Sequence, residues 1–111
     1  MKKIIYIAGP IRSKTFFGYL LNVFRAWKAA VRLWRLGWAV VCPHMNSLFM
    51  CRRGMPEGLF LEGDLDILRN CDAIVMLKGW ENSVGAEGEL EEAQLFKLRI
   101  YYQLGAKREI G

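Results

Sequence analysis

Three short runs of apolar residues, none of which alternates with polar residues, most constrain the fold of this chain. They span residues 4–8, 38–42 and 73–77. Continuous runs that are rich in β-branched residues and bounded by turn residues predict strands buried on both faces, as in a parallel sheet. A fourth candidate strand spans residues 99–103. The runs therefore predict a small parallel sheet.

Helical patterns lie between the predicted strands. From residue 18 to residue 36, apolar side chains recur at three- and four-residue steps, and Gly37 follows as a helix-ending residue. Similar spacing predicts helices over residues 58–70 and 85–98. The alternation of strands and helices favours the α/β class: a small doubly wound, flavodoxin- or Rossmann-like parallel sheet of four to five strands flanked by helices.

Length and composition indicate a single domain over residues 1–111. Hydrophobic residues make up 53% of the chain and charged residues 24%, which excludes a disordered tail protein. No run of 18 apolar residues predicts a membrane span. The three cysteines form no CxxC pair and there is a single histidine, so we expect a reduced, cytoplasmic protein without a metal or a cofactor.

The net charge of +5 permits an anionic partner, which is nucleic acid, a membrane surface or a phosphorylated small molecule. Within the first helical pattern, cations stand beside apolar residues at helical spacing, a pattern that can lie on membranes or nucleic acid. We favour a solvated cationic edge with an aromatic face in the core or in a dimer interface. The cations are Arg25, Lys28, Arg32 and Arg35, and the apolar residues are Phe24, Trp27, Val31 and Trp34.

The aromatic content of this helix also bears on assembly. Phe16, Phe17, Trp27 and Trp34 are more than one small helix face usually needs for its own core. We therefore expect a homo-oligomer, most simply a two-fold dimer.

Ligands of doubly wound sheets bind at the carboxyl ends of the strands, so the candidate site residues are those that follow each run. After the first run, Gly9 permits close approach of a ligand, and Arg12 is a planar donor suited to phosphate or carboxylate. After the second run, His44 is a candidate for orienting a substrate base, with a hydrogen-bonded structural histidine as the alternative.

The third run ends in a loop that leads into a helix. Asn82, Ser83 and Gly85 are binding candidates in this loop, because Ser83 is a good N-cap and free amides at a helix start bind anions. At about 100° per residue, Glu89 lies nearly opposite the face shared by its neighbouring glutamates, towards the sheet. A carboxylate held there is a candidate nucleophile or base.

A second carboxylate can approach the same edge of the sheet. Asp64 lies one turn before Leu68 on the same helix face, and the alternative is that Asp64 is a surface acid.

Three ordered motifs together resemble a known family. They are YIAGPIR at residues 6–12, DLxxLxxCDA at residues 64–73 and SxGAxxExxxA at residues 83–93, and their order and spacing cover nearly the whole chain. The chain resembles the nucleoside 2-deoxyribosyltransferase superfamily. It looks closest to the short bacterial and phage-type members and to the deoxynucleoside 5′-monophosphate N-hydrolases.

The resemblance implies a role for each matching residue. Glu89 would attack the anomeric carbon of the sugar, Asp64 would handle the proton on the leaving base, and Tyr6 would position the nucleophile. In the monophosphate hydrolases, residues at the positions of Arg12 and Ser83 hold the 5′-phosphate.

The resulting expectation is an enzyme that cleaves or transfers at the N-glycosidic bond of a nucleoside or nucleotide, with no nucleic-acid or membrane partner. Two alternatives remain: a nucleotide-binding module without turnover, and a basic-helix binder of nucleic acid or membranes. Hydrolysis and transfer both stay open. Arg12 and Ser83 favour a monophosphate, whereas Pro10, where the hydrolases have a serine, favours a free nucleoside.

Overall fold

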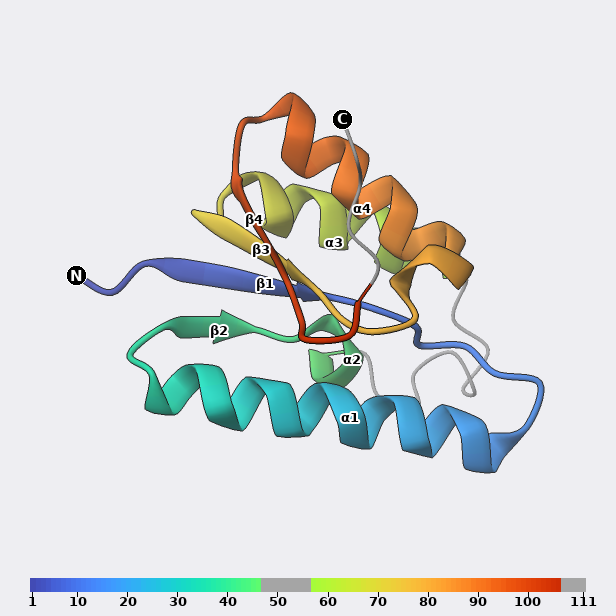
Figure 1. The fold of residues 1–111 in the computed structure, drawn as a ribbon. Helices are drawn as coiled ribbons and strands as arrows, with labels where there is room; N and C mark the ends of the chain where they lie inside the picture. Colours follow the sequence, from blue (N-terminus) through green and yellow to red (C-terminus); the bar gives the residue numbers. More distant parts are fainter. Residues whose placement is uncertain (47–56, 107–111) are drawn as a thin grey trace.

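Four parallel strands form the central sheet in the computed structural model, which describes residues 1–46 and 57–106. The strand order is β2-β1-β3-β4, and every neighbouring pair is parallel (Figure 1). This arrangement confirms the predicted α/β class and a small doubly wound parallel sheet, with four strands. The strands are β1 (Ile4–Ala8), β2 (Ala39–Val41), β3 (Ala73–Met76) and β4 (Arg99–Tyr102).

The two central strands are β1 and β3, which pair in register from Ile5 opposite Ala73 to Ala8 opposite Met76. All of β3, and all of β1 after its first residue, is buried, as the continuous apolar runs predict. The edge strand β4 differs, because Arg99 and Tyr101 are exposed on one of its faces.

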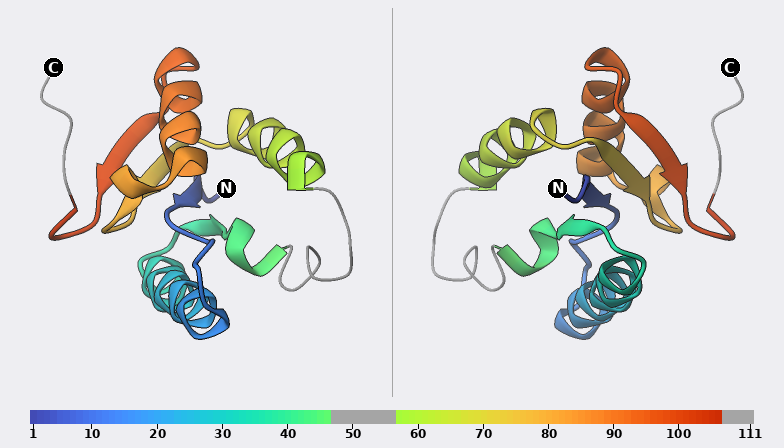
Figure 2. Two further views of the ribbon diagram at one scale, coloured as in Figure 1. Left: turned by 90° about the vertical axis from the view of Figure 1, so that its right-hand side faces the viewer. Right: turned by 90° about the vertical axis from the view of Figure 1, so that its left-hand side faces the viewer.

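Helices cover both faces of the sheet. The helices α1 (Phe16–Arg35) and α2 (Pro43–Asn46) lie on one face, and α3 (Glu57–Arg69) and α4 (Val84–Leu95) lie on the other (Figures 1 and 2). The short 3-10 helix η2 (Trp80–Asn82) lies between β3 and α4. None of the helices among the described residues is long and apolar enough to cross a membrane.

The helix ends follow from local sequence. Thr15 caps α1 by accepting a hydrogen bond from the Gly18 amide at 3.0 Å, and Gly37 ends the helix with a φ of 101°. The last helix ends at Leu95 rather than at the expected residue 98. There Lys97 adopts a φ of 58°, and the Leu98 amide returns to the carbonyl of Ala93.

The face by which α1 packs on the sheet is not its aromatic face. The buried residues of α1 are small, namely Val23, Ala26 and Ala30, and the two alanines pack with Ile5 and Val75 in one half of the core. We expect the aromatic face in one of two places, the core or a dimer interface, and the exposure of its rings excludes the core. The exposed large apolar side chains of the helix are Phe16, Phe17, Leu20, Phe24, Trp27 and Trp34.

The other half of the core lies between the sheet and the helices α3 and α4. It contains Tyr6, Ile74 and Met76 from the strands, together with Leu68 from α3 and Leu90 from α4. This packing fixes α3 and α4 relative to the carboxyl edge of the sheet, where the candidate site lies.

Candidate functional site

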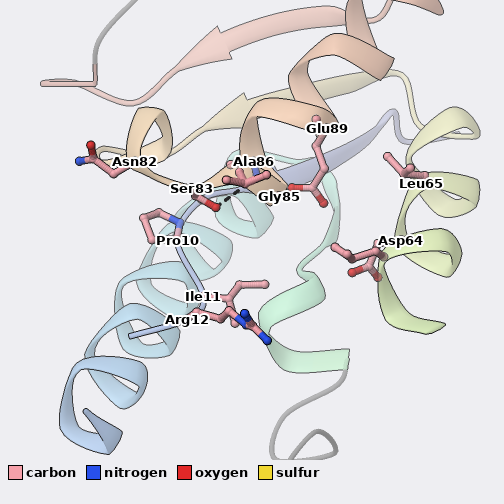
Figure 3. A pocket seen from close by; sticks show the side chains of 14 residues that line it. Pro10, Ile11, Arg12, Asp64, Leu65, Asn82, Ser83, Gly85, Ala86 and Glu89 are labelled. Carbon is pink, nitrogen blue, oxygen red and sulfur yellow. Dashed lines mark hydrogen bonds between the residues drawn. The ribbon is translucent and has the colours of Figure 1, made fainter. Parts of the chain in front are cut away.

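A cavity of about 610 Å³ opens at the carboxyl edge of the sheet, between α3 and the start of α4. Its size falls within the range of small-molecule sites, roughly 300–1,000 Å³. Figure 3 shows Asp64 and Glu89 on one side of the cavity and Arg12 and Ser83 on the other. Lining residues come from the loop after β1 (9–12), from α3 (61, 64 and 65) and from the start of α4 (82–86, 88 and 89).

Glu89 occupies the position that the helical spacing predicts. Its neighbours Glu87 and Glu91 are exposed, whereas Glu89 is partly buried and lines the cavity. Burial raises the pKa of Glu89 to about 7, and the nearby charge of Asp64 adds to the rise. Near neutral pH this carboxyl group therefore exchanges readily between its ionised and protonated forms.

Tyr6 is fully buried in β1 and donates a hydrogen bond from its hydroxyl group to Oε2 of Glu89. Burial, followed by the negative charge of Glu89, raises the pKa of Tyr6 far above its ordinary value. The phenol therefore stays protonated and remains a donor. Its hydrogen bond lowers the pKa of Glu89, which partly opposes the effect of burial.

Asp64 comes to the cavity from α3, on the side facing Glu89 (Figure 3). Burial raises the pKa of this half-buried carboxyl group. The helix α3 is tied to α4 by Arg69, whose Nε lies 2.8 Å from Oε2 of Glu92. The sequence interpretation that Asp64 reaches the carboxyl edge is supported over the surface-acid alternative, because Asp64 lines the cavity.

The loop after β1 is packed closely against the end of β3. A Cβ atom at Gly9 would lie 2.9 Å from Cβ of Leu77, so the glycine permits close packing of the chain as well as access to the cavity. Arg12 lines the cavity, and its side chain is exposed. Asn22 of α1 holds this loop by donating to the carbonyl groups of Ile11 and Arg12 at 3.3 and 3.2 Å.

His44 does not line the cavity. Its side chain is 2% exposed, and its Nε2 lies 2.9 Å from the carbonyl oxygen of Pro10. Burial lowers the pKa of His44 to about 4, so the ring is neutral near pH 7 and donates to Pro10 through Nε2. This geometry favours the alternative of a hydrogen-bonded structural histidine, because His44 holds the loop after β1 through a backbone carbonyl group and does not reach the cavity.

The start of α4 forms the wall of the cavity across from α3. Ser83 caps the helix, because its hydroxyl oxygen accepts from the Ala86 amide at 3.2 Å. The amides in the first turn of any helix have no acceptor one turn earlier within the helix, so they are available to a side-chain cap or to a ligand. Gly85 lines the cavity, and a Cβ there would meet nothing closer than Leu61 at 3.9 Å. Asn82 also lines the cavity, although its side chain is exposed.

Sequence reasoning missed several residues of the site. Gly88 lies one residue before Glu89 and one turn after Gly85, so both glycines leave open the face of α4 that carries the carboxylate. Leu61 and Leu65 line the cavity beside Asp64, at the helical spacing that could have identified them. Nothing in the sequence singled out Asn22, because a polar side chain within an amphipathic helix gives no sign of its partner.

Metal binding has no support in the described residues, where no group of three or more His, Cys, Asp or Glu side chains could hold an ion. Cys42 and Cys71 are buried free thiols, and Cys51 lies outside the described residues. The chemistry of the cavity therefore rests on two carboxyl groups of raised pKa, a phenol donor, one arginine and a helix start.

Fold and cavity together define a small α/β protein with paired carboxyl groups at the carboxyl edge of a parallel sheet. Residues 3–102 match the profile of the family described as a domain of unknown function (DUF4406), and the chain belongs to this family. The search of curated proteins found no match.

Proposed function

We propose that the protein is an N-glycosidase or deoxyribosyltransferase that acts on a nucleoside or its 5′-monophosphate. The observation that carries this proposal is the arrangement of Glu89. Its carboxylate accepts a hydrogen bond from the buried Tyr6 and faces Asp64 across a cavity of nucleoside-compatible size. The motifs that resemble the nucleoside 2-deoxyribosyltransferase superfamily supply the substrate class.

Ionised Glu89 acts as the nucleophile in the first step. One of its oxygens forms a bond to C1′ of the sugar while the C1′–N bond to the base breaks, and the bonding electrons leave with the base. Asp64 donates a proton to the departing base, and because burial raises its pKa, its acid form is more accessible than that of an exposed aspartate. Such positioned acid catalysis typically contributes about 10²–10⁴-fold.

In the second step, water or a second base attacks C1′ while the ester bond between C1′ and Glu89 breaks, and the bonding electrons return to the Glu89 carboxylate. Water releases the free sugar, and a base yields a new nucleoside. Asp64, now ionised, accepts the proton of the attacking group. This division of one difficult displacement into two steps is the general advantage of a covalent intermediate. Tyr6 keeps Glu89 oriented throughout, because its hydroxyl group stays protonated.

A 5′-phosphate would lie at the other end of the cavity. Arg12 provides a planar cationic donor, and the Ser83 hydroxyl group and the amides at the start of α4 provide further donors. This supports the monophosphate over the free nucleoside. Pro10 contributes no amide donor at this end.

The experiment measures base release, by chromatography, from a panel of ribo- and deoxyribonucleosides and their 5′-monophosphates. We expect release from at least one deoxynucleoside 5′-monophosphate, and a loss of at least about 10³-fold in Glu89→Ala, the size typical of lost nucleophiles. Glu91→Ala is the matched control, because Glu91 is exposed on the same helix. If the protein binds a nucleotide tightly but releases no base, the proposal of an enzyme is wrong and the protein is a nucleotide-binding module.

A further inference from the structure

Six large apolar side chains form a continuous exposed stripe along α1. Each is between 39% and 76% exposed, although the helix also has a separate buried face. Cations lie over two of its rings, since Nζ of Lys28 lies 5.7 Å from the ring centre of Phe24 and Nζ of Lys2 lies 5.7 Å from that of Trp34. The aromatic stripe consists of Phe16, Phe17, Leu20, Phe24, Trp27 and Trp34.

The aromatic stripe occupies its own sector of the helix. At about 100° per residue, it lies between the buried sector around Ala26 and a basic row of exposed cations. The sector directly opposite Ala26 contains Phe17 and Arg35, with Lys28 beside them, whereas Trp27 and Trp34 lie to one side. The basic row consists of Arg25, Lys28, Arg32 and Arg35.

The exposed apolar area is large for a chain of this size. Aromatic side chains bury about 150–250 Å² each when covered, so five half-exposed rings and a leucine leave on the order of 500 Å² uncovered. This is comparable to the largest patch of a typical monomer and approaches the roughly 800 Å² that each partner contributes to a stable interface. Along one side of the stripe, the basic row supplies the polar rim that such an interface needs.

We propose that a second copy of this chain covers the aromatic stripe, with α1 packed against α1 about a two-fold axis. The stripe is apolar along most of the helix and is therefore complementary to itself. The stripe lies to one side of the sector that points directly away from the sheet, so a helix packed alongside α1 can cover it. A flat membrane would instead meet the outermost sector, where Lys28 and Arg35 lie, before it reached Trp27 and Trp34.

Charge gives this interface a distinctive signature. The helix α1 contains four cations and no acidic residue, so the two-fold contact gathers eight cations around the apolar seam. Salt screens this repulsion, with a Debye length of about 10 Å at 0.1 M and about 3 Å at 1 M. Dimer affinity should therefore increase with salt, whereas binding to nucleic acid or to an anionic membrane weakens with salt.

The test is sedimentation equilibrium of the full chain at micromolar concentration, in low and high salt. We expect a mass of twice 12.8 kDa, with tighter association at high salt. Phe24→Glu should weaken dimerisation by at least roughly 30-fold, as truncation of an interface hot spot does. Phe96→Glu is the matched control, because Phe96 has similar exposure, also has a cation over its ring, and lies on the other side of the sheet.

A rescue experiment separates an interface from a folding defect. Trp27→Glu and Trp27→Lys should each be monomeric, with the circular dichroism spectrum of the parent, and an equimolar mixture should recover a dimer. A parent chain that stays monomeric in both salts contradicts the proposal. So does a monomer that floats with vesicles containing phosphatidylserine, which would assign the stripe to a membrane, or a dimer that Phe24→Glu leaves intact.

Discussion

Glu89 and His44 are both buried titratable groups, yet they act on stability with opposite signs. Burial raises the pKa of Glu89 to about 7, so the folded chain holds a proton that the unfolded chain has released between about pH 4.5 and pH 7. Stability from this group therefore falls as pH rises through that window. Burial lowers the pKa of His44 to about 4, so its contribution rises with pH between about 4 and 6.5.

Replacement of Glu89 should remove its contribution to the pH dependence of the free energy of unfolding. Glu89→Gln removes the cost of a buried charge, and we expect it to stabilise the fold at pH 8 by up to about 3 kcal/mol, with little change at pH 4.5. Urea unfolding at the two pH values measures the difference. Glu91→Gln, at an exposed position, should show no such dependence, and an equal gain at both pH values would contradict the prediction.

His44 should show the reverse dependence. His44→Gln keeps a donor for the Pro10 carbonyl but has no titratable ring, so its stability should fall less than that of the parent as pH is lowered from 6.5 to 4. Thermal unfolding across this range checks the slope. Parallel curves for parent and variant would mean that His44 is not buried in its neutral form.

Tyr6 tunes Glu89 through one hydrogen bond. Because that bond lowers the pKa of Glu89, Tyr6→Phe should move the pKa above its present value of about 7. Side-chain carbon NMR of the glutamate residues follows the titration directly, without any need for catalysis. Tyr102→Phe is the control, since Tyr102 packs against Trp80. An unchanged Glu89 titration in Tyr6→Phe would remove the tuning role.

At the scale of elements, the sequence predicts β1 and β3 well because both strands are buried on both faces and give unbroken apolar runs. It also predicts where α4 begins, because Ser83 is an unambiguous cap. The packing face of α1 was not predictable in the same way. The helix buries small side chains against the sheet and keeps most of its aromatic ones exposed, so apolar spacing alone does not show which sector meets the sheet.

In the candidate site, too, local sequence patterns predict some residues and not others. Glu89 and Asp64 could be predicted because helical spacing fixes the direction of each side chain. The position of His44 depends on a contact with Pro10, 34 residues earlier in the chain, which no local pattern encodes. Asn22 holds the same loop from α1 and was missed for the same reason.

Two glycines of the site should respond differently to the same substitution. Gly9→Ala should destabilise the fold by about 1–3 kcal/mol, because the new Cβ would lie 2.9 Å from Cβ of Leu77. Gly85→Ala should fold normally, since its Cβ would approach nothing closer than 3.9 Å, yet it should weaken nucleotide binding by filling part of the cavity. Chemical denaturation and calorimetric titration with a nucleoside 5′-monophosphate measure the two effects.

The opposite pattern would contradict this account of the loop and the cavity. A destabilised Gly85→Ala would mean that the start of α4 is packed more tightly than the structure shows. Full nucleotide affinity in a well-folded Gly85→Ala would mean that the ligand lies elsewhere.

At the scale of the whole molecule, charge is segregated along the chain and across the sheet. All eleven Asp and Glu residues follow residue 56, whereas ten of the sixteen Lys and Arg residues precede it. The helix α1, on one face of the sheet, contains four cations and no acidic residue, whereas α3 and α4, on the other face, contain the acids of the site (Figure 2). The net charge alone indicated an anionic partner, but the fold places the basic row of α1 away from the lining of the cavity.

The covalent role of Glu89 is the central claim, and mass spectrometry of the acid-quenched protein tests it most directly. After mixing with a deoxynucleoside 5′-monophosphate, we expect free base and a sugar-phosphate ester on the peptide that contains Glu89, and no ester in Glu89→Gln. Release of base with the ester on another residue, or base release that Glu89→Gln leaves unchanged, would contradict the account.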